Sequence, residues 1–453
     1  MLGAPRGTCS AARVLALALV VVSCASEATR PPTTGDGLTV APSVQGTAAV
    51  AACDAGNGGI TLPAGFCAAV FADGVGPARH LTVRPNGDVY VAVSDGAGGT
   101  GGVVGLRDSD GDGRADQRTR FGSAGGNGIA WYGSYLYFAE NGRILRYAFK
   151  QGRLGPNGSA KVVVSGLPSK VEHVTKSIAF GSATTMYVSI GSASNSCQVS
   201  NRSAGSPGKD PCPELATRAG VWVGDPQRTG QTAANLSRFA TGLRNGVAMA
   251  VHSSGALFAV QMDRDNLHDN WPGLFSLDDD ARIPAEELVL VENGADFGWP
   301  YCYFDGPRDL KVLAPEYGGD GVTQGSDGRC AAARRPLLAL PAHWAPMSMV
   351  FYQGTAFPAA YRGGAFVAFH SDYFWGTRAR PDSPGYNVVY VPFSGATPTG
   401  AYSVFADGFA GPTATSRQSA AHRPTGLAVA ADGALLIADD VGGRIWRVVY
   451  TGP

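Results

Sequence analysis

The stretch that decides the fold runs from His173 to Asn195 and reads His-Val-Thr-Lys-Ser-Ile-Ala-Phe-Gly-Ser-Ala-Thr-Thr-Met-Tyr-Val-Ser-Ile-Gly-Ser-Ala-Ser-Asn. Apolar and small residues alternate over 177–180, and the alternation resumes over 186–190 after a short turn. A period of two on both sides of a turn predicts a β-hairpin. A histidine stands at the entrance to its first strand.

Similar hairpins recur on both sides of this one. The other paired runs are 81–83 with 89–93, 128–131 with 136–139, 244–249 with 257–260, 347–352 with 364–369, and 423–429 with 435–438. Gly 63 and Pro 29 supply abundant turn formers, and long helical periodicity is absent. Repeated hairpins of this kind predict an all-β protein, a six-bladed β-propeller with four strands in each blade.

The N-terminus predicts export from a bacterial cell. Residues 1–24 have basic residues before an apolar run, Val14–Val22, that is too short to span a bilayer. The run ends in Val21-Val-Ser-Cys24, which is typical of a lipoprotein signal, so a lipid on Cys24 would be the only membrane anchor. Ordinary secretion with cleavage elsewhere is the alternative. Residues 25–53 predict a flexible tether, and 54–453 the propeller domain.

The charge balance excludes one class of partner. Lys+Arg 36 equals Asp+Glu 36, so no general field favours nucleic acid or an anionic membrane surface. We therefore expect no nucleic-acid partner and a periplasmic or outer-surface location.

Cysteines other than Cys9 and Cys24 are even in number, as expected for disulfides in an exported chain. Sequence alone allows many connectivities, and the simplest pairs sequence neighbours. Zinc binding is the alternative, and the lack of paired CxxC spacing argues against it. The simplest pairs are Cys53–Cys67, Cys197–Cys212 and Cys302–Cys330.

In a propeller the first strand of each blade lines the central channel, so the residues that precede these strands gather at one mouth. These residues are polar and partly cationic, which suits a flat ligand with several negative charges. They are Arg79, His80, Asn127, His173, Arg244, Asn245, His343, Trp344 and Arg423.

Four segments, in order within the repeats, carry a family resemblance. They are His173 to Asn195, Gly242-Leu-Arg-Asn245, Gly294-Ala-Asp-Phe-Gly-Trp-Pro300 and Arg423-Pro-Thr-Gly426. From about Leu62 to its end the chain resembles the glucose/sorbosone dehydrogenases. These are six-bladed propellers that use pyrroloquinoline quinone (PQQ) and calcium, of the soluble aldose sugar dehydrogenase and L-sorbosone dehydrogenase types.

The resemblance implies roles for individual residues. His173 matches the general base, and Arg244 with Asn245 matches the pair that polarises the quinone carbonyl. The remaining implied cofactor contacts are Gln261, Arg423 and Thr425. The implied calcium ion lies beside the cofactor, bound largely by backbone carbonyls after Gln261, so its candidate ligands are Met262, Asp263 and Asp265.

The chain also departs from the family pattern. Ser192 stands where glucose-specific members have a carboxylate that orients the histidine, which predicts a weaker base. Met262-Asp-Arg-Asp-Asn-Leu267 replaces a Gly-Pro segment, and His370-Ser-Asp-Tyr-Phe-Trp375 replaces another family run. No lysine matches the one that contacts the cofactor in glucose-specific members.

A second acidic cluster lies apart from these motifs. Asp108-Ser-Asp-Gly-Asp-Gly-Arg-Ala-Asp116 has the carboxylate spacing of a calcium loop but lacks the terminal glutamate of an EF-hand. A peripheral calcium held by Asp108, Asp110, Asp112 and Asp116 is one reading, and a solvated polar loop is the other.

The sequence thus predicts an exported, PQQ-dependent and Ca²⁺-dependent oxidoreductase. It would oxidise a sugar or sugar aldehyde and pass electrons to an external acceptor, a cytochrome or a quinone. A calcium-dependent lactonase and a non-catalytic binding propeller are the alternatives.

Overall fold

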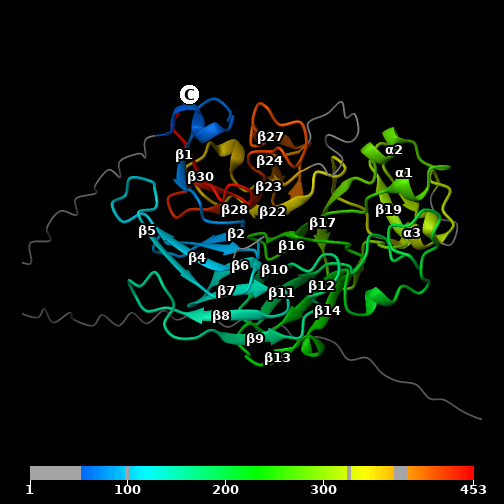
Figure 1. The fold of residues 1–453 in the computed structure, drawn as a ribbon, viewed down its shortest axis with the longest axis horizontal. Helices are drawn as coiled ribbons and strands as arrows, with labels where there is room; N and C mark the ends of the chain where they lie inside the picture. Colours follow the sequence, from blue (N-terminus) through cyan, green and yellow to red (C-terminus); the bar gives the residue numbers. More distant parts are fainter. Residues whose placement is uncertain (1–52, 97–100, 324–327, 372–384, 453) are drawn as a thin grey trace, which may run out of the picture. The chain divides into compact units, whose positions relative to one another are not determined.

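The computed structural model describes residues 53–96, 101–323, 328–371 and 385–452. These residues form small sheets arranged in a ring, which confirms the predicted all-β, six-bladed propeller (Figure 1). The signal segment 1–24 with Cys24, the tether up to residue 52 and the segment 372–375 lie outside the described residues. Within the described part, no helix combines the length and the apolar character that crossing a membrane requires.

The first three blades follow one another along the chain, each with its inner strand first. Blade 1 contains β2 (Ala78–Val83), β3 (Val89–Val93), β4 (Gly102–Arg107) and β5 (Gln117–Phe121). Blade 2 contains β6 (Gly126–Tyr132), β7 (Tyr135–Glu140), β8 (Ile144–Ala148), β9 (Lys161–Ser165) and the short β13 (Gln231–Thr232). Blade 3 contains β10 (Lys176–Ser182), β11 (Thr185–Ile190), β12 (Gly220–Gly224), β14 (Ser237–Thr241) and the short β18 (Ala295–Asp296).

The last three blades complete the ring. Blade 4 contains β15 (Ala248–Val251), β16 (Leu257–Gln261), β17 (Glu286–Val291) and β21 (Leu338–Leu340). Blade 5 contains β22 (Pro346–Phe351), β23 (Ala365–Phe369), β24 (Asn387–Val391) and β27 (Ser403–Ala406). Blade 6 contains β28 (Pro424–Val429), β29 (Leu435–Asp439), β30 (Ile445–Tyr450) and β1 (Phe66–Ala72).

The two ends of the propeller close the ring by sharing blade 6. Strand β1 pairs antiparallel with β30, from Phe66 opposite Tyr450 to Ala72 opposite Ile445. The inner strands β2, β6, β10, β15, β22 and β28 contact one another in that cyclic order. A closed ring leaves each inner strand with a neighbour on both sides, so their starts lie around one mouth.

Two inner-strand glycines allow neighbouring blades to approach closely. A Cβ on Gly426 of β28 would lie 2.2 Å from the Arg79 carbonyl oxygen, and one on Gly128 of β6 would lie 2.7 Å from the Lys176 oxygen. Both glycines come early in their strands, near the mouth. The absence of a side chain there lets the polar strand starts of adjacent blades contact one another.

Insertions in blade 4 build a lobe beside the ring (Figure 1). Its apolar core includes Leu267, Phe275, Tyr303 and Val312. The lobe places the loop after Gln261 against the mouth. Its elements are α1 (Leu267–Asn270), α2 (Leu277–Arg282), β19 (Cys302–Asp305), β20 (Leu310–Leu313) and α3 (Arg329–Ala332).

The remaining short elements are η1 (Ala55–Gly59), η2 (Pro213–Ala216), η3 (Ala233–Asn235), η4 (Pro315–Tyr317), η5 (Ala359–Tyr361), β25 (Phe393–Ser394) and β26 (Thr397–Pro398). The three predicted disulfides are confirmed, because each cysteine pairs with its sequence neighbour. They join Cys53 to Cys67, Cys197 to Cys212 and Cys302 to Cys330.

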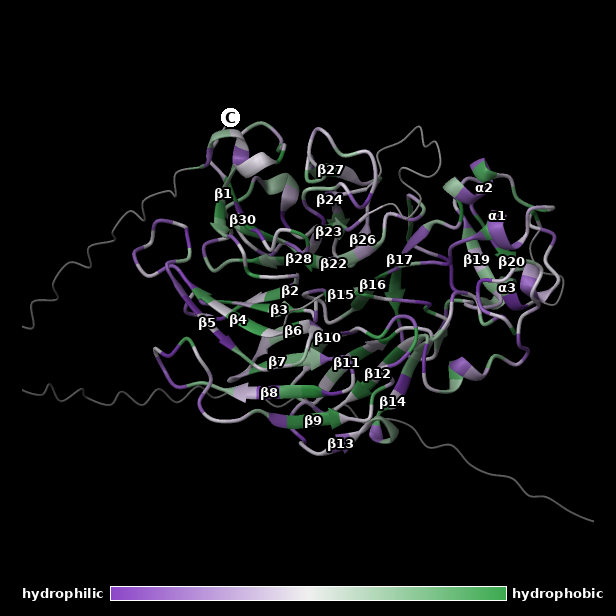
Figure 2. Cartoon of the chain, viewed as in Figure 1, coloured by the Kyte–Doolittle hydropathy of each residue, from purple (hydrophilic) through white to green (hydrophobic). Residues whose placement is uncertain are grey.

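Apolar strand residues pack between the sheets, and polar residues concentrate in the loops (Figure 2). The joint between blades 5 and 6 is rich in aromatic rings. Phe66 of β1 meets Phe357, Tyr361 and Phe405 edge-on, with ring centroids 4.8, 5.2 and 5.0 Å apart. This cluster fixes the closing strand against blade 5.

We therefore expect Phe66→Ala to destabilise the propeller by about 3–5 kcal/mol, because it removes the ring at the centre of this cluster. Val404→Ala is the matched control, since Val404 is 44% exposed on β27, and it should cost less than about 1 kcal/mol. Thermal and denaturant unfolding measure both. Equal effects from the two substitutions would show that the closing strand does not depend on this cluster.

Candidate active site

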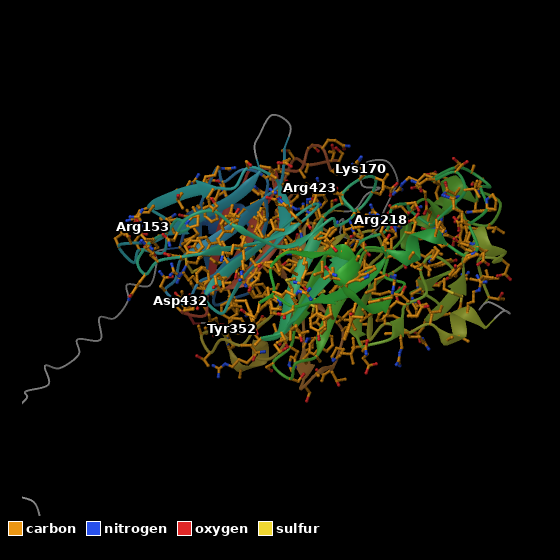
Figure 3. All side chains as sticks on the ribbon, turned by 90° about the horizontal axis from the view of Figure 1, so that it is seen from below. Arg153, Lys170, Arg218, Tyr352, Arg423 and Asp432 are labelled. Atoms are coloured by element: carbon orange, nitrogen blue, oxygen red, sulfur yellow. A yellow bond between two sulfur atoms is a disulfide. The ribbon has the colours of Figure 1, made fainter. Side chains whose placement is uncertain are left out.

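The structure brings the predicted mouth residues to one end of the ring. Arg79 Nε donates to Asn127 Oδ1 at 3.0 Å, and Asn127 Nδ2 donates to Ser177 Oγ at 3.1 Å. Arg423 directly precedes β28 and Asp432 lies in the turn after it, and Figure 3 shows these two residues well apart. The strand starts form the mouth, and the hairpin turns form the other end.

His173 lies just before β10, and its hydrogen bonds define its tautomer. Its Nδ1 lies 2.9 Å from Ser192 Oγ and 3.2 Å from the Ser192 carbonyl oxygen. The Ser192 hydroxyl donates its hydrogen to the Ser194 carbonyl at 2.6 Å. Both Ser192 oxygens therefore accept, so Nδ1 carries the proton and Nε2 keeps its lone pair.

The electrostatic surroundings keep His173 neutral. Burial, reinforced by the positive charge of Arg244, lowers the pKa of His173 to about 3. A neutral imidazole with a lone pair on Nε2 can accept a proton at neutral pH. Ser192 therefore orients the ring without supplying the negative charge that a carboxylate would add.

The backbone around His173 is strained and closely packed. His173 has φ of 50° and Val171 has φ of 71°, both in the left-handed region that β-branched residues in particular avoid. A Cβ on Gly191 would lie 2.5 Å from His173 Cβ and 2.7 Å from Asn245 Oδ1. Gly191 therefore lets His173 and Asn245 flank the same short segment.

Arg244 is a buried cation, 1% exposed. Its Nε donates to the Asn195 carbonyl at 3.1 Å, and its Nη2 donates to Asn195 Oδ1 at 3.0 Å and Asp265 Oδ2 at 3.1 Å. Its Nη1 donates to the carbonyls of Met262 and Asp263, at 3.3 and 2.6 Å. All five N–H donors of the guanidinium are thus engaged by the protein.

Gln261 and Asn245 extend this group. Gln261 Oε1 accepts from the Arg244 backbone N–H at 2.9 Å, and its Nε2 donates to Glu287 at 2.9 Å. Lys311 Nζ lies 2.8 Å from the same carboxylate, so the buried lysine pairs inside the protein. Asn245 Nδ2 has a weak sulfur partner, Met262 Sδ at 3.8 Å, which leaves its amide adaptable.

A second group of charges surrounds Arg423. Arg79 Nη1 pairs with Asp440 at 2.9 Å, and His370 Nε2 lies 2.9 Å from the same carboxylate. Arg423 Nη2 bonds His370 Nδ1 and Ser371 Oγ, each at 2.9 Å, while its buried Nε has no hydrogen-bond partner among the residues that the structure describes. The cations at this side of the mouth hold Asp440 ionised, with its pKa well below the usual range, although burial alone would raise it.

The two groups are joined along the inner strands. His80 Nε2 lies 3.4 Å from Asn127 Nδ2 and 2.6 Å from the Met347 carbonyl oxygen. Asn127 continues the link to Ser177 at the start of β10, near His173. Burial lowers the pKa of His80 to about 4, so this imidazole is also neutral at neutral pH.

Three other predicted residues have internal roles in the structure. Thr425 Oγ1 donates to the Ala78 and Ala438 carbonyls, at 2.8 and 3.1 Å, and ties β28 to β2. His343 Nε2 lies 2.7 Å from the Asp280 oxygen, and the buried Trp344 packs on Phe369. Their predicted cofactor or sugar contacts stay predictions.

The acidic loop lies at the opposite end of the ring. Asp108 accepts from the backbone of Gly111 and Gly113, at 2.7 and 2.8 Å, and Asp116 accepts from Ser109. The carboxylates of Asp108, Asp110 and Asp116 can approach one ion together, while Asp112 accepts from the Arg114 backbone. A peripheral calcium here stays a prediction.

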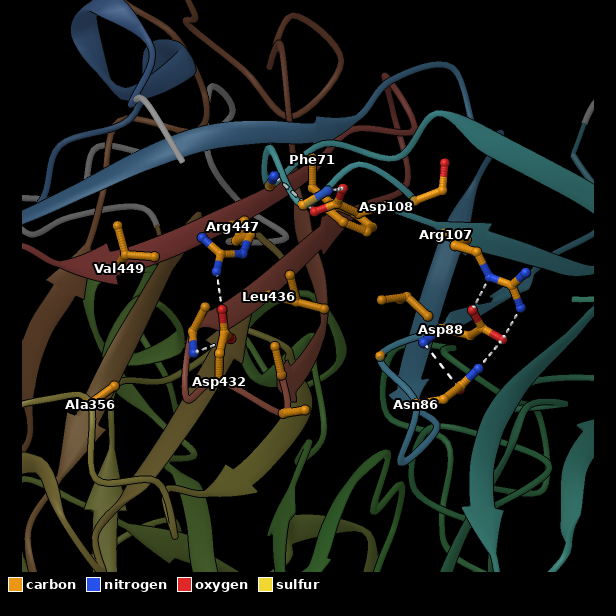
Figure 4. Close-up of a pocket in the computed structure, with 18 of the residues that line it drawn as sticks. Phe71, Asn86, Asp88, Arg107, Asp108, Ala356, Asp432, Leu436, Arg447 and Val449 are labelled. Carbon is orange, nitrogen blue, oxygen red and sulfur yellow. Dashed lines mark hydrogen bonds and ion pairs between the residues drawn. The ribbon is translucent and has the colours of Figure 1, made fainter. Parts of the chain in front are cut away.

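The same loop borders a cavity of about 640 Å³ between blades 1 and 6 (Figure 4). Four of its charged lining residues form two ion pairs, Asp88 with Arg107 and Asp432 with Arg447. The cavity is lined by hairpin turns, which lie at the opposite end of the strands from His173.

The sequence analysis assigned no role at the mouth to four residues that lie there in the structure. They are Asn195, Asp440, His370 and Glu287. Asp440 and His370 follow the second strand of their blades, as Ser192 does, and Gln261 is the last residue of such a strand. An antiparallel second strand ends at the mouth. The position just after each predicted second strand could therefore have been used to predict further mouth residues. No local signal marks Glu287, which lies in a third strand.

The comparisons place the chain in a family. The family model described as TrAA12-like matches residues 60–451, so the chain belongs to the TrAA12-like family. A pyrroloquinoline quinone-dependent pyranose dehydrogenase of Coprinopsis cinerea is 28% identical over 241 residues, covering 46% of this chain and 30% of that protein. An uncharacterized protein of Borreliella burgdorferi is 28% identical over 223 residues, covering 47% and 48%. The chain therefore matches about half or less of these curated relatives.

Solved structures share the fold. The Trichoderma reesei AA12 protein in its iodide structure has a TM-score of 0.68 at 18% identity, covering 86% of this chain and 98% of that one. Its calcium structure gives 0.66 at 17%, covering 86% and 97%. The holo PQQ domain of the Coprinopsis cinerea pyranose dehydrogenase gives 0.66 at 19%, covering 86% and 97%. The resemblance to PQQ-using sugar dehydrogenases is confirmed.

The lowered histidine pKa values predict acid sensitivity. An unfolded histidine titrates near about 6.5, whereas folded His173 titrates at about 3 and His80 at about 4. Between these values the unfolded chain binds more protons, so stability falls as pH falls, by at most about 1.4 kcal/mol per pH unit for each histidine. His173→Gln should flatten this slope in unfolding measured from pH 7 to 4. An unchanged slope in the variant would contradict the neutral buried imidazole.

Proposed function

We propose that the protein is an exported PQQ-dependent sugar dehydrogenase. The observation that carries the proposal is a neutral His173, with its Nε2 lone pair free, beside the fixed guanidinium of Arg244. Membership of the TrAA12-like family supports the cofactor. Export and a lipid anchor on Cys24 rest on residues 1–24, and the proposed location is the periplasm or outer surface of a bacterium.

The mouth residues fit PQQ, a flat quinone with several carboxylates. Within the described part of the chain, the buried Nε of Arg423 has no hydrogen-bond partner, and a guanidinium is well suited to bind a carboxylate. Arg423 and Asn245 would hold the cofactor, Gln261 would support the site by holding the Arg244 backbone, and Arg244 would supply a fixed positive charge. When bound, PQQ supplies a two-electron acceptor.

The chain's own residues would handle the proton. His173 Nε2 accepts the proton of the sugar's anomeric hydroxyl, or of an aldehyde hydrate, as the C–H electrons leave with their hydrogen as hydride. Ser192 holds the Nδ1–H and so fixes the ring's orientation. Arg244 disfavours a lasting charge on His173, which promotes release of the proton afterwards. The sugar product is a lactone or an acid, and an external cytochrome or quinone takes the electrons.

Reconstitution tests the proposal. Purified apoprotein with PQQ should reduce an artificial dye when an aldose is added, and His173→Ala should lower kcat by about 10²–10⁴-fold. Because the pKa of His173 is about 3, this histidine stays neutral between pH 7 and 5, and its protonation should not lower kcat over that range. Hydrolysis of lactones without PQQ would instead indicate a lactonase. Absence of both activities, with ligand binding retained, would indicate a binding propeller.

Gly191→Ala offers a sharper test of the site. Its methyl group would press on His173 and Asn245, so we expect kcat to fall at least about tenfold while the blade still folds. Gly273→Ala is the matched control, because a Cβ there meets nothing within 4 Å. Dye reduction and unfolding temperature separate the two effects. Wild-type turnover in Gly191→Ala would place the chemistry elsewhere.

A further inference from the structure

The resemblance implies a calcium ion beside the cofactor, held by backbone carbonyls after Gln261, but Arg244 occupies these oxygens. Its Nη1 donates to Met262 O at 3.3 Å and to Asp263 O at 2.6 Å. Calcium takes about 6–8 oxygen ligands at about 2.3–2.6 Å. An ion bound to these carbonyls would lie against a buried guanidinium of the same sign.

The carboxylate of Asp265 is also engaged, and that of Asp263 is engaged in part. Asp265 Oδ2 accepts from Arg244 and from Arg202, at 3.1 and 3.3 Å, and its Oδ1 lies 3.5 Å from His343 Nδ1. Asp263 is 4% exposed, and its Oδ1 accepts from the Arg264 backbone N–H at 2.6 Å, while its buried Oδ2 has no hydrogen-bond partner among the described residues. One open carboxylate oxygen, Asp263 Oδ2, falls short of the about 6–8 oxygen ligands that calcium takes, so Met262, Asp263 and Asp265 as they are held here do not fit a calcium ion.

The oxygen cage around the guanidinium is held from several sides. Asn195 Nδ2 donates to the Asp265 carbonyl at 2.8 Å, and the Asp265 N–H donates back to Asn195 Oδ1 at 2.9 Å. Trp299 Nε1 donates to the Asn195 carbonyl at 2.9 Å. Moving Arg244 out would break its five hydrogen bonds and take away the side-chain donor of the Met262 and Asp263 carbonyl oxygens.

We propose that Arg244 replaces the calcium ion of the related enzymes, so that this protein binds PQQ without a metal beside it. A guanidinium fixed by oxygen ligands supplies a permanent positive charge where the family uses a divalent cation. The inference rests on the proposed function, since it concerns how the same site receives PQQ. In this proposal Arg244 is a fixed positive charge, held in place by the oxygens that accept from its N–H donors.

The closing experiment titrates PQQ into the full-length protein and follows quenching of tryptophan fluorescence, first in excess EGTA and then in excess calcium. The background substitutions Asp108→Asn and Asp110→Asn silence the peripheral acidic loop. We expect the same Kd in both conditions, within about twofold. Binding that needs calcium, or that tightens about tenfold or more with it, would overturn the inference and keep the proposed function. Absence of binding in both conditions would overturn the proposed function itself.

Two variants sharpen the result. Arg244→Ala removes the guanidinium from the two carbonyls and from Asp265, so the Kd of this variant for PQQ in EGTA should rise about tenfold or more. Added calcium should restore part of the lost affinity. Arg202→Ala is the matched control, because it removes a neighbouring cation from Asp265 without exposing the carbonyls. It should stay insensitive to calcium. Unfolding temperatures check that each variant folds, and if Arg244→Ala does not, the wild-type titration still decides.

Discussion

The buried guanidinium of Arg244 is the interaction on which the mouth depends. It joins the segment after β11 at Asn195 to the loop after β16 at Met262, Asp263 and Asp265. These segments are far apart in sequence and meet because adjacent blades share the mouth. With the cation in place the loops are fixed, and the same charge helps to keep His173 neutral. One residue thus couples the shape of the site to its protonation state.

The propeller explains why such residues collect at one end. Each inner strand begins at the mouth and each second strand ends there. Residues such as His173, before an inner strand, and Ser192, after a second strand, therefore lie at the same end of the ring. Inner-strand glycines such as Gly426 let adjacent blades approach, and the aromatic cluster around Phe66 closes the ring. The hydrophobic packing between blades therefore supports a polar channel mouth that could not be stable alone.

The fold and the mouth could be predicted from sequence because both follow from a repeat. Alternating runs around Ile178 and Met186 indicate hairpins, and the residues before each first strand, such as His173 and Arg244, indicate one end of the ring. The hydrogen-bond partners of Arg244 could not be predicted from the sequence. Backbone carbonyls, Asn195 and Asp265 all compete for its N–H donors, and these groups lie on loops that come together only in the folded ring. Asp440 escaped for a related reason, since its partners Arg79 and His370 belong to other blades.

We expect one mouth of the propeller to hold a neutral His173 and a caged Arg244 around a bound quinone. A crystal structure of the protein grown with PQQ in the presence of a chelator tests this most directly. We expect PQQ in contact with His173 and Arg423, with Arg244 still hydrogen-bonded to the Met262 and Asp263 carbonyls. Quinone bound at another place, or Arg244 displaced from these oxygens, would contradict it.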